Sequence, residues 1–260
     1  MGLLDGRVAL VTGGGRGIGA GISRRLAAEG ATIAVNYSRS EDEASEVINE
    51  IVSAGGRARA YRASVADYDA CRSMVDQVIA DFGFVDILVN NAGIASKGRA
   101  VADTDAAEVE KLLAVHAIGA HQLSAAVLPS MRTRGRGDIV FVSSVATSHY
   151  SAKGAPYNMG KAAMEALAYT LAKEERHNGI HVNIAAPGLV ETDMGVRLAR
   201  SLQGKREMED LRELDAKSPF GHVCQPNDVA EVVLWLCSAG AGYVTGQRIE
   251  CDGGGAISSY

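Results

Sequence analysis

Short apolar runs rich in β-branched residues recur along the chain and alternate with longer amphipathic stretches. The apolar runs lie at residues 7–13, 31–37, 85–93, 138–144 and 180–188, and a weaker strand at 57–63 and a final one at 246–254 complete the set. Their length and composition predict strands, whereas the spacing of apolar positions between them predicts helices. The helical stretches lie at 41–54, 67–82, 105–131, 157–176 and 226–238, with a further helix opening after the first strand. Nearly continuous apolar strands alternating with helices indicate an α/β fold, in which a doubly wound parallel sheet (Rossmann-type) carries helices on both faces.

No linker, composition break or internal repeat divides the 260 residues. A chain of this length can bury one large core, so we predict a single domain over residues 1–260. The segment 193–217 is charged and has a helical pattern. Two interpretations are open for it: a lid over a bound substrate, or a helix that is simply solvated.

Composition and charge exclude several classes of protein. With 47% hydrophobic residues, 22% charged residues and a net charge of −5, the chain has no overall attraction for nucleic acid or an anionic membrane. The apolar stretch VAEVVLWLC is too short to cross a bilayer. The four cysteines lack C-x-x-C spacing and the six histidines lack metal-ligand spacing, so we expect reduced thiols and no metal. The first residues lack a secretory signal pattern, and we expect a cytoplasmic protein.

The turn after the first predicted strand carries a phosphate-binding pattern. It reads TGGGRGIG at residues 12–19 and leads into the first predicted helix. Gly13, Gly17 and Gly19 permit a tight turn and close approach of a pyrophosphate, and the start of the helix offers unpaired N–H groups. A glycine-rich turn says little by itself, but between a strand and a helix it predicts dinucleotide binding.

Tyr157 and Lys161 form a second candidate site. They lie four residues apart in the stretch APYNMGK, so on a helix their side chains project from one face. Such a pair on its own is most often a polar stripe on a helix surface. It becomes a catalytic candidate only where the fold brings a cofactor and a hydroxyl partner to it.

Six motifs along the chain together resemble those of the short-chain dehydrogenase/reductase family. They are the glycine turn, NNAG at 90–93, Ser144, the Tyr157–Lys161 pair, PG at 187–188 followed by Thr192, and YVTGQRIECDGG at 243–254. They occur in the family's order over nearly the whole chain, which is most similar to the 3-oxoacyl-acyl-carrier-protein reductase branch. The resemblance implies an oxidoreductase that transfers hydride between a nicotinamide and a carbonyl or secondary alcohol, and a homotetramer.

The resemblance also implies roles for the catalytic candidates. Tyr157 is expected to be the general acid or base on the substrate oxygen, Ser144 its hydrogen-bonding partner, and Lys161 a ligand of the nicotinamide ribose. Ser143 is the neighbouring alternative, but the thirteen-residue separation from Tyr157 favours Ser144. An ammonium about 4 Å from a phenol, at an effective dielectric of about 20, is worth roughly 4 kcal/mol. Lys161 is therefore expected to lower the pKa of Tyr157 toward neutrality.

Two positions depart from the family pattern. His116, in VHAIG, replaces an asparagine whose implied role is to shape its helix and to offer a backbone carbonyl to a water near the lysine. Because a carbonyl survives a change of side chain, we keep His116 as a catalytic candidate and interpret the substitution as tolerated; retuned or lost catalysis is the alternative. Ser64 stands where an acidic residue usually binds adenine, and the backbone of Val65 can still contribute there.

Cofactor choice depends on the end of the second predicted strand. A carboxylate there would bind the ribose hydroxyls of NAD and repel the 2′-phosphate of NADP. This chain has Asn36 instead, followed by Arg39 and Ser40, and Arg16 lies in the glycine turn. Arginines suit phosphate contacts, so we predict a preference for NADP(H) over NAD(H). By resemblance, the other cofactor contacts are Ile18, Asn90, Ala92, Gly93, Pro187, Gly188, Val190 and Thr192.

The sequence leaves the small-molecule substrate open. The branch implies a 3-oxoacyl thioester, but alcohols, steroids and sugars fit the same catalytic core, because specificity lies in the loops. His149 and Tyr150 are candidate walls of the substrate site. An NAD(H)-dependent dehydrogenase of one of these compounds is an alternative. A cofactor-binding regulatory protein with little turnover is another, supported only by His116.

Overall fold

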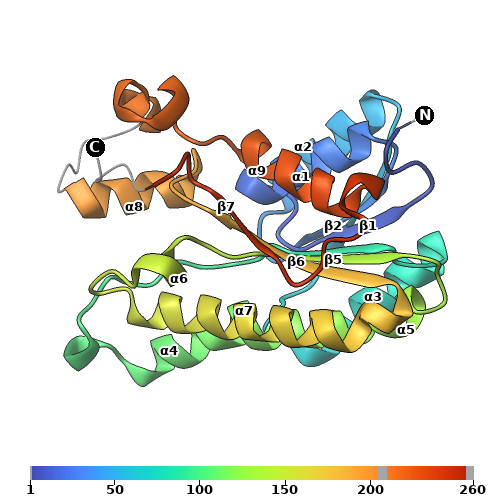
Figure 1. Ribbon diagram of the computed structural model, residues 1–260, viewed down its shortest axis with the longest axis horizontal. Coiled ribbons are helices and arrows are strands. Elements are labelled where there is room, and N and C mark those ends of the chain that lie inside the picture. The colour runs from blue at the N-terminus through green and yellow to red at the C-terminus, as the bar shows by residue number, and fades with distance from the viewer. Residues whose placement is uncertain (1, 204–209, 256–260) are drawn as a thin grey trace.

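A computed structural model describes residues 2–203 and 210–255 of the chain. Seven parallel strands form one sheet in the order β3-β2-β1-β4-β5-β6-β7 (Figure 1). The strands are β1 (Val8–Val11), β2 (Thr32–Tyr37), β3 (Arg57–Arg62), β4 (Ile87–Asn90), β5 (Gly137–Val142), β6 (Ile180–Pro187) and β7 (Arg248–Cys251). The predicted α/β fold with a doubly wound parallel sheet is confirmed.

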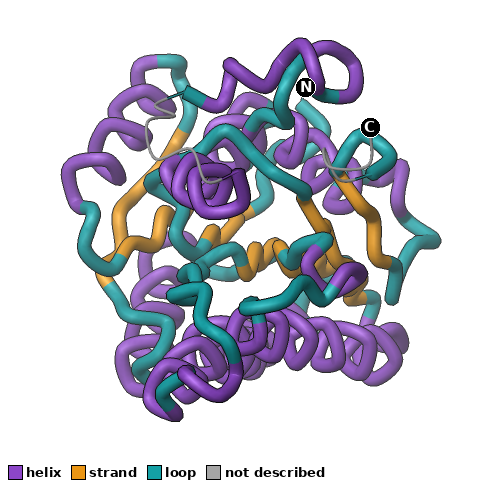
Figure 2. The backbone as a smooth tube through the Cα atoms, turned by 90° about the vertical axis from the view of Figure 1, so that its left-hand side faces the viewer, coloured by secondary structure: helices purple, strands orange, loops and turns teal. Residues whose placement is uncertain are grey.

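Helices cover both faces of this sheet, as two views at right angles show (Figures 1 and 2). One face carries α1 (Gly17–Ala28), α2 (Glu41–Ser53) and α9 (Pro226–Cys237). The other carries α3 (Tyr68–Phe82), α4 (Ala106–Leu113), α5 (Gly119–Met131) and α7 (Ala155–Glu175). The shorter helices α6 (Ala146–His149) and α8 (Asp193–Gln203) follow β5 and β6. Short 3₁₀ segments lie at Val101–Asp103, Arg176–Asn178, Leu211–Lys217, Pro219–Gly221 and Ala239–Ala241.

Alternate residues of the central strands enter two different cores. Leu10 and Ile139 pack in the core that includes residues of α3, α5 and α7. Their neighbours Ala9, Val11 and Val140 pack in the core that includes residues of α1, α2 and α9. Because side chains alternate across a strand and both faces are covered, each central strand reads as an unbroken apolar run, whereas the edge strands β3 and β7 also carry charged residues. This is the pattern by which the strands were predicted.

The predicted helix at 105–131 is wrong as a single α-helix. A π-turn, Ala114–Ile118, separates α4 from α5 and contains His116. The N–H of Gly119 donates to the Ala114 carbonyl five residues earlier. A Cβ at Gly119 would lie 2.3 Å from the Val65 carbonyl oxygen, so the helix passes close to the loop after β3. The wider turn therefore accommodates a close approach of backbones, and π-turns of this kind often lie at functional sites.

Among the described helices, the run Ala106–Met131 is long and apolar enough by composition to cross a membrane. In the fold, Leu112, Leu123, Val127 and Met131 are fully buried, and Leu123, Val127 and Met131 belong to the core shared with α3 and α7. Packing within the domain thus accounts for the apolar character of this run.

The segment predicted as a lid or a solvated helix, 193–217, is helical in its described parts, and 204–209 lie outside the described residues. Its apolar residues form a small third core, in which Ala199, Leu211, Leu214 and Val223 are buried. A helix with such a core is more than a solvated charged surface. Its role as a lid stays a prediction.

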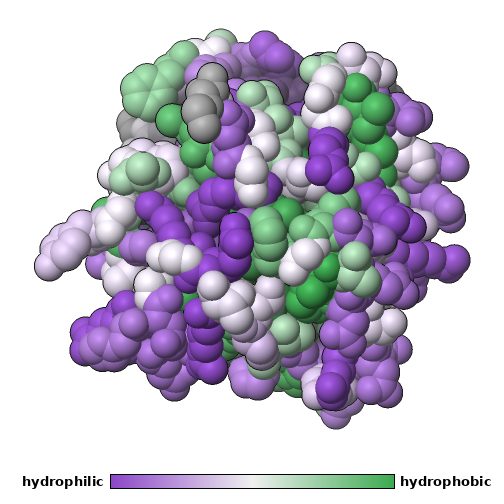
Figure 3. Space-filling model, turned by 90° about the vertical axis from the view of Figure 1, so that its right-hand side faces the viewer, coloured by the Kyte–Doolittle hydropathy of each residue, from purple (hydrophilic) through white to green (hydrophobic). Residues whose placement is uncertain are grey.

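Charged residues hold the end of the sheet at which the strands begin. Arg7 and Arg136 both contact the buried Asp138 carboxylate, at 2.7 and 2.9 Å. Arg134 pairs with Asp86 at 3.0 Å. Figure 3 shows this end of the molecule largely covered by hydrophilic residues, with small apolar areas between them. The glycine turn, NNAG, Ser144 and the PG stretch lie at the opposite end, where the strands finish.

Candidate active site

The site motifs follow the carboxyl ends of neighbouring strands. The glycine turn follows β1, NNAG ends β4, Ser144 lies two residues after β5, and PG closes β6. β1 pairs with β2 on one side and with β4 on the other, so the chain reverses its direction across the sheet at β1. A crevice outside the strand ends at such a switch point is where open α/β sheets bind ligands. The fold thus brings the separate motifs to one edge.

The glycine turn has the geometry of a phosphate cradle. Gly13 and Gly17 adopt φ angles of 59° and 51°, which favour glycine. A Cβ at Gly19 would lie 2.1 Å from the Gly13 carbonyl oxygen. Arg16 is the N-cap of α1, and among the described residues no side chain caps this helix and no acidic residue lies in its first turn. The N–H groups of Gly17, Ile18 and Gly19 fit a pyrophosphate at this helix start.

Asn91 and Thr12 anchor this turn, a role that the sequence analysis missed. The Thr12 hydroxyl accepts hydrogen bonds from the backbone N–H groups of Asn91 and Ala92, both at 2.9 Å. The Asn91 amide donates to the Thr12 and Gly13 carbonyls at 2.8 and 3.3 Å. The doubled asparagine in NNAG was the available signal. The predicted contact Asn90 instead turns inward and donates to Ser124 at 3.3 Å.

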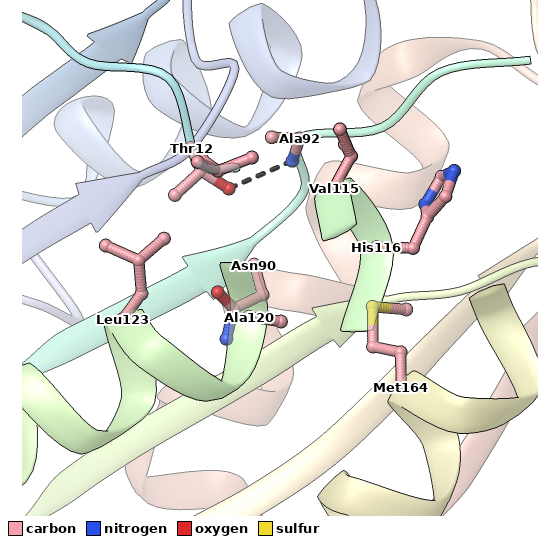
Figure 4. A pocket seen from close by; sticks show the side chains of 9 residues that line it. Thr12, Asn90, Ala92, Val115, His116, Ala120, Leu123 and Met164 are labelled. Atoms are coloured by element: carbon pink, nitrogen blue, oxygen red, sulfur yellow. Dashed lines mark hydrogen bonds between the residues drawn. The ribbon is translucent and has the colours of Figure 1, made fainter. Parts of the chain in front are cut away.

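A cavity of about 10 Å³, enough for about one water, lies beside Asn90 (Figure 4). It is lined by Thr12, Val65, Asn90, Ala92, Val115, His116, Ala120, Leu123 and Met164. Asn90 Oδ1 has no hydrogen-bond partner within the described part of the chain. The His116 ring points away from the other lining residues in Figure 4. The cavity is too small for a substrate and fits a structural water.

Asn36, at the end of β2, is committed to the backbone. It is only 2% exposed. Its Oδ1 accepts from the Gly13 N–H at 3.2 Å, and its Nδ2 donates to the Ala63 and Tyr61 carbonyls at 3.0 and 3.2 Å. Asn36 therefore holds the glycine turn against β2 and β3, and its side chain has no free donor or acceptor that faces the crevice.

The two arginines predicted to bind phosphate are exposed. Arg16 lies in the glycine turn, at the N-cap position of α1, and its side chain makes no capping hydrogen bond to the described residues of this helix. Arg39 follows β2 and precedes Ser40, the N-cap residue of α2. Within the described residues, neither guanidinium forms an ion pair. Ser64 is exposed and Val65 is buried. The charge needed for a 2′-phosphate is thus present at the surface.

The stretch after β6 closes the other side of the crevice. A Cβ on Gly17 would lie 3.2 Å from the Thr192 methyl carbon, so Thr192 packs beside the glycine turn. Pro187 accepts from the Val145 N–H at 3.1 Å, and Gly188 donates to Cys251 at 3.0 Å. Val190, whose side chain is buried, pairs with Cys224 in an isolated bridge. The stretch expected at the carboxamide end is therefore next to the turn expected at the phosphates.

Ser144 follows the end of β5, and Tyr157 and Lys161 lie near the start of α7; the three side chains converge there. Pro156 in the first turn of α7 suits a helix start, and Tyr157 follows it. The Ser144 hydroxyl lies beside the Tyr157 phenol and acts to lower its pKa. Lys161, 4% exposed, donates to the Val142 carbonyl at 2.7 Å, and its Nζ lies 5.9 Å from the Tyr157 ring centroid. Ser143 is buried and bonds to Glu165 instead, so the geometry favours Ser144.

Comparisons with known proteins identify this arrangement. A family model described as enoyl-(acyl carrier protein) reductase matches residues 13–255. The versicolorin reductase stcU of Emericella nidulans is 37% identical over 259 residues, which cover 96% of each chain. The 3-oxoacyl-[acyl-carrier-protein] reductase FabG of Staphylococcus epidermidis is 36% identical, over 95% of this chain and 97% of its own. A Burkholderia cenocepacia short-chain dehydrogenase, crystallised with NADP, superposes with a TM-score of 0.86 at 32% identity, over 98% and 99% of the chains.

The chain belongs to the short-chain dehydrogenase/reductase family. It is an oxidoreductase that uses NAD(P)H to reduce the carbonyl group of a small molecule. FabG and versicolorin reductase are about equally similar to it in sequence, so sequence identity does not single out one substrate among those of its relatives.

The expectation that the pKa of Tyr157 lies near neutrality is wrong, because this pKa is raised above its ordinary value. Burial raises the pKa of Tyr157, and the Ser144 hydroxyl opposes this only in part. Burial also lowers the pKa of Lys161 to about 8, against the opposing charge of Glu165. The ammonium is directed at the Val142 carbonyl, and desolvation of the phenol dominates its pKa. At neutral pH, the phenol therefore keeps its proton.

His116 is buried in the π-turn beside the catalytic group of the reductase. Its Nε2 lies 2.9 Å from the Ile94 carbonyl oxygen and 3.4 Å from the Ile94 backbone nitrogen, and the shorter contact, with an oxygen that only accepts, favours the tautomer protonated on Nε2. Nδ1 is buried and has no partner within the described residues. Burial and the charge of Lys161 lower the pKa of His116 to about 3. Gly93 and Gly160 make room for the ring, since a Cβ on either would lie 2.9 or 3.2 Å from it.

Proposed function

We propose that this protein is an NADPH-dependent ketone reductase in which Tyr157 donates a proton to the substrate oxygen. The observation that supports this most directly is the convergence of Ser144 and the buried ammonium of Lys161 on Tyr157, with Lys161 Nζ 5.9 Å from the Tyr157 ring centroid. These groups lie where the strand ends also bring the glycine turn. The geometry is that of a general acid, its orienting hydroxyl and a cation held at one site.

Tyr157 is in the protonation state that a reduction requires. A ketone that accepts hydride develops negative charge on its oxygen and needs a proton there. Because burial raises the pKa of the phenol, the proton is present on Tyr157 throughout the neutral range. Ser144 provides a second hydroxyl for the same oxygen. The site thus favours reduction over the reverse reaction, in which the phenol would first have to lose its proton.

Lys161 provides hydrogen-bond donors and a positive charge at the site. An ammonium has three N–H donors, of which the Val142 carbonyl takes one. The others can bind ribose hydroxyls, as the family resemblance implies. The positive charge favours the phenolate that forms when Tyr157 has given up its proton. Loss of this charge would therefore slow proton donation as well as loosen the cofactor.

The crevice fits a dinucleotide with a 2′-phosphate. The glycine turn and the uncapped start of α1 are suited to the pyrophosphate, and Arg16 and Arg39 to the 2′-phosphate. When bound, the nicotinamide supplies the hydride. The relative crystallised with NADP supports the preference for this cofactor. Asn36, buried under the turn, presents no carboxylate that would favour NADH.

A 3-oxoacyl thioester is the first substrate candidate, because FabG is named for the reduction of such a compound, and the family model is also named for an acyl-carrier-protein substrate. A versicolorin is the second, since the versicolorin reductases are about equally similar. Oxidation of NADPH should be followed with acetoacetyl thioesters, versicolorins, steroid ketones and keto sugars. We expect turnover with one of the first two classes. Tight NADPH binding without turnover of any carbonyl would favour the regulatory alternative.

A further inference from the structure

A buried ion pair lies directly behind Ser144 and Lys161. Glu165 is on α7, one helical turn after Lys161, and its side chain is 11% exposed. Arg248 comes from β7, 83 residues later, and its side chain is 15% exposed. The Arg248 Nε donates to Glu165 Oε1 at 3.1 Å. Removing two charges from water is costly unless the pair is well hydrogen-bonded, so the remaining contacts of this pair matter.

These contacts converge on the segment that carries Ser144. Ser143 and Thr147 both donate their hydroxyl hydrogens to Glu165 Oε1, Thr147 at 2.8 Å. Arg248 Nη2 donates to the Ser144 carbonyl at 3.1 Å and to the Thr147 hydroxyl at 3.0 Å. The pair thus holds the backbone of Ser144 and a side chain on either side of it. A shift of this segment would move the Ser144 hydroxyl relative to Tyr157.

Glu165 also acts on Lys161 through its charge. It raises the pKa of Lys161 against burial, which lowers it. Other ionisable groups face this region from each packed element. They are His116 in the π-turn, Tyr157 and Tyr169 on α7, His149 on α6, and Arg248 and Glu250 on β7. His116 is neutral, and Arg248 is shared between Glu165 and Glu250. Glu165 is therefore the anion that acts on the lysine.

We propose that Glu165 and Arg248 form a positioning pair for the catalytic candidates, in which Arg248 fixes the backbone of Ser144 and Glu165 holds a carboxylate one helical turn from Lys161. Neither residue touches the reacting atoms. The inference rests on the proposed reductase function for its kinetic consequences. Its electrostatic half concerns Lys161 alone and is measurable without turnover.

Two substitutions separate the two halves of the pair. Glu165→Gln keeps the shape of the side chain and removes its charge. We expect the pKa of Lys161 to fall by about one unit, and the alkaline limb of kcat to move down by about one pH unit. Arg248→Gln leaves the charge of Glu165 in place. We expect it to lower kcat about tenfold at every pH, with the Lys161 pKa not lowered, because the Ser144 carbonyl keeps Thr147 as a donor but loses the charged guanidinium donor that ties it to β7.

The pKa of Lys161 is measured by NMR of protein labelled with [ε-¹³C]lysine, its resonance being the one lost in Lys161→Met. Glu250→Gln, which changes the outer carboxylate on Arg248, is the matched control. It should leave the Lys161 pKa in place and change kcat by less than about twofold. A lower Lys161 pKa in Glu165→Gln, together with no turnover of any carbonyl by the unmodified protein, would support the positioning pair and reject the proposed function. Unchanged NMR and pH profiles in a folded Glu165→Gln protein would overturn the inference. So would a lower melting temperature as the only effect of both variants.

Discussion

The His116 imidazole meets the Tyr157 ring edge to face, with the ring centroids 5.3 Å apart and the planes at 80°. Lys161 lies near the same ring, with its Nζ 5.9 Å from the centroid. Aromatic pairs in this arrangement contribute about 0.5–1.5 kcal/mol beyond the area they bury. The orientation of the proposed proton donor therefore depends on a residue of the π-turn as well as on the lysine of its own helix.

Removing the phenol should abolish turnover and spare the cofactor. Tyr157→Phe keeps the ring that packs against His116 but has no proton to donate. We expect kcat to fall by at least about 100-fold, the typical contribution of a general acid. The dissociation constant of NADPH, measured by fluorescence titration, should change by less than about threefold, because the hydroxyl acts on the substrate oxygen. A Phe variant that keeps most of its activity would remove Tyr157 from the mechanism.

The exposed arginines should discriminate between the two nicotinamide cofactors. Hydrogen bonds to charged groups are worth about 1.5–3 kcal/mol, so Arg39→Ala should weaken NADPH binding roughly 10- to 100-fold and leave NADH nearly unchanged. Arg16→Ala should act in the same direction. Arg57→Ala, at the opposite end of β3, is the control for a general loss of positive charge. Equal affinity of the unmodified protein for NADPH and NADH would show that these arginines are only surface charges.

The reduction rate should have an alkaline limb set by Lys161. The pKa of Lys161 is lowered to about 8, so its ammonium is present below pH 8 and is lost above it. The pKa of Tyr157 is raised, so the phenol stays protonated through the same range. At saturating NADPH, kcat for reduction should be flat from about pH 6 to 7.5 and fall above about pH 8. A rate that stays constant to pH 10 would contradict this role for the lysine.

The sequence predicted the layout of the fold better than the contacts within the site. Continuous apolar runs such as 138–144 placed the strands because both faces of the sheet are covered. The helix at 105–131 looked uninterrupted in the sequence because the apolar positions continue through 114–118. The π-turn there is defined by the backbone hydrogen bond from Gly119 to Ala114, and it accompanies the approach of Gly119 to Val65. Glu165 and Arg248 could not be paired from sequence, since 83 residues separate them.

Exposed apolar residues lie on the elements that the family resemblance assigns to subunit interfaces. They are Ile118 at 52% exposure, Met159 at 48%, Tyr169 at 37%, Trp235 at 42% and the fully exposed Tyr243. We expect a homotetramer with one interface on α4, α5 and α7 and another at α9 and β7. Light scattering at micromolar concentration should give four times the mass of one chain, and Tyr169→Glu should give a smaller particle. A monomeric mass for the unmodified protein would contradict the expectation.

His116→Asn should change turnover by less than about tenfold, which is ~1.4 kcal/mol of activation free energy. Both residues offer the same backbone carbonyl, and the asparagine amide can replace the imidazole as a neutral donor and acceptor. The pKa of His116 is lowered to about 3 by burial and by the charge of Lys161, so the imidazole is neutral from pH 5 upward. The pH–rate profile should therefore have no limb that disappears in the Asn variant.

The comparison should be made across a pH series at saturating NADPH, with His121→Asn as the control for an exposed histidine on α5. A limb between pH 5 and 7 that is lost only in His116→Asn would mean that the imidazole titrates and takes part in proton transfer. A gain of 100-fold or more on installing asparagine would instead identify a reductase whose catalysis has been turned down by this residue. The small change follows from a neutral ring whose Nε2–H is already committed to the Ile94 carbonyl.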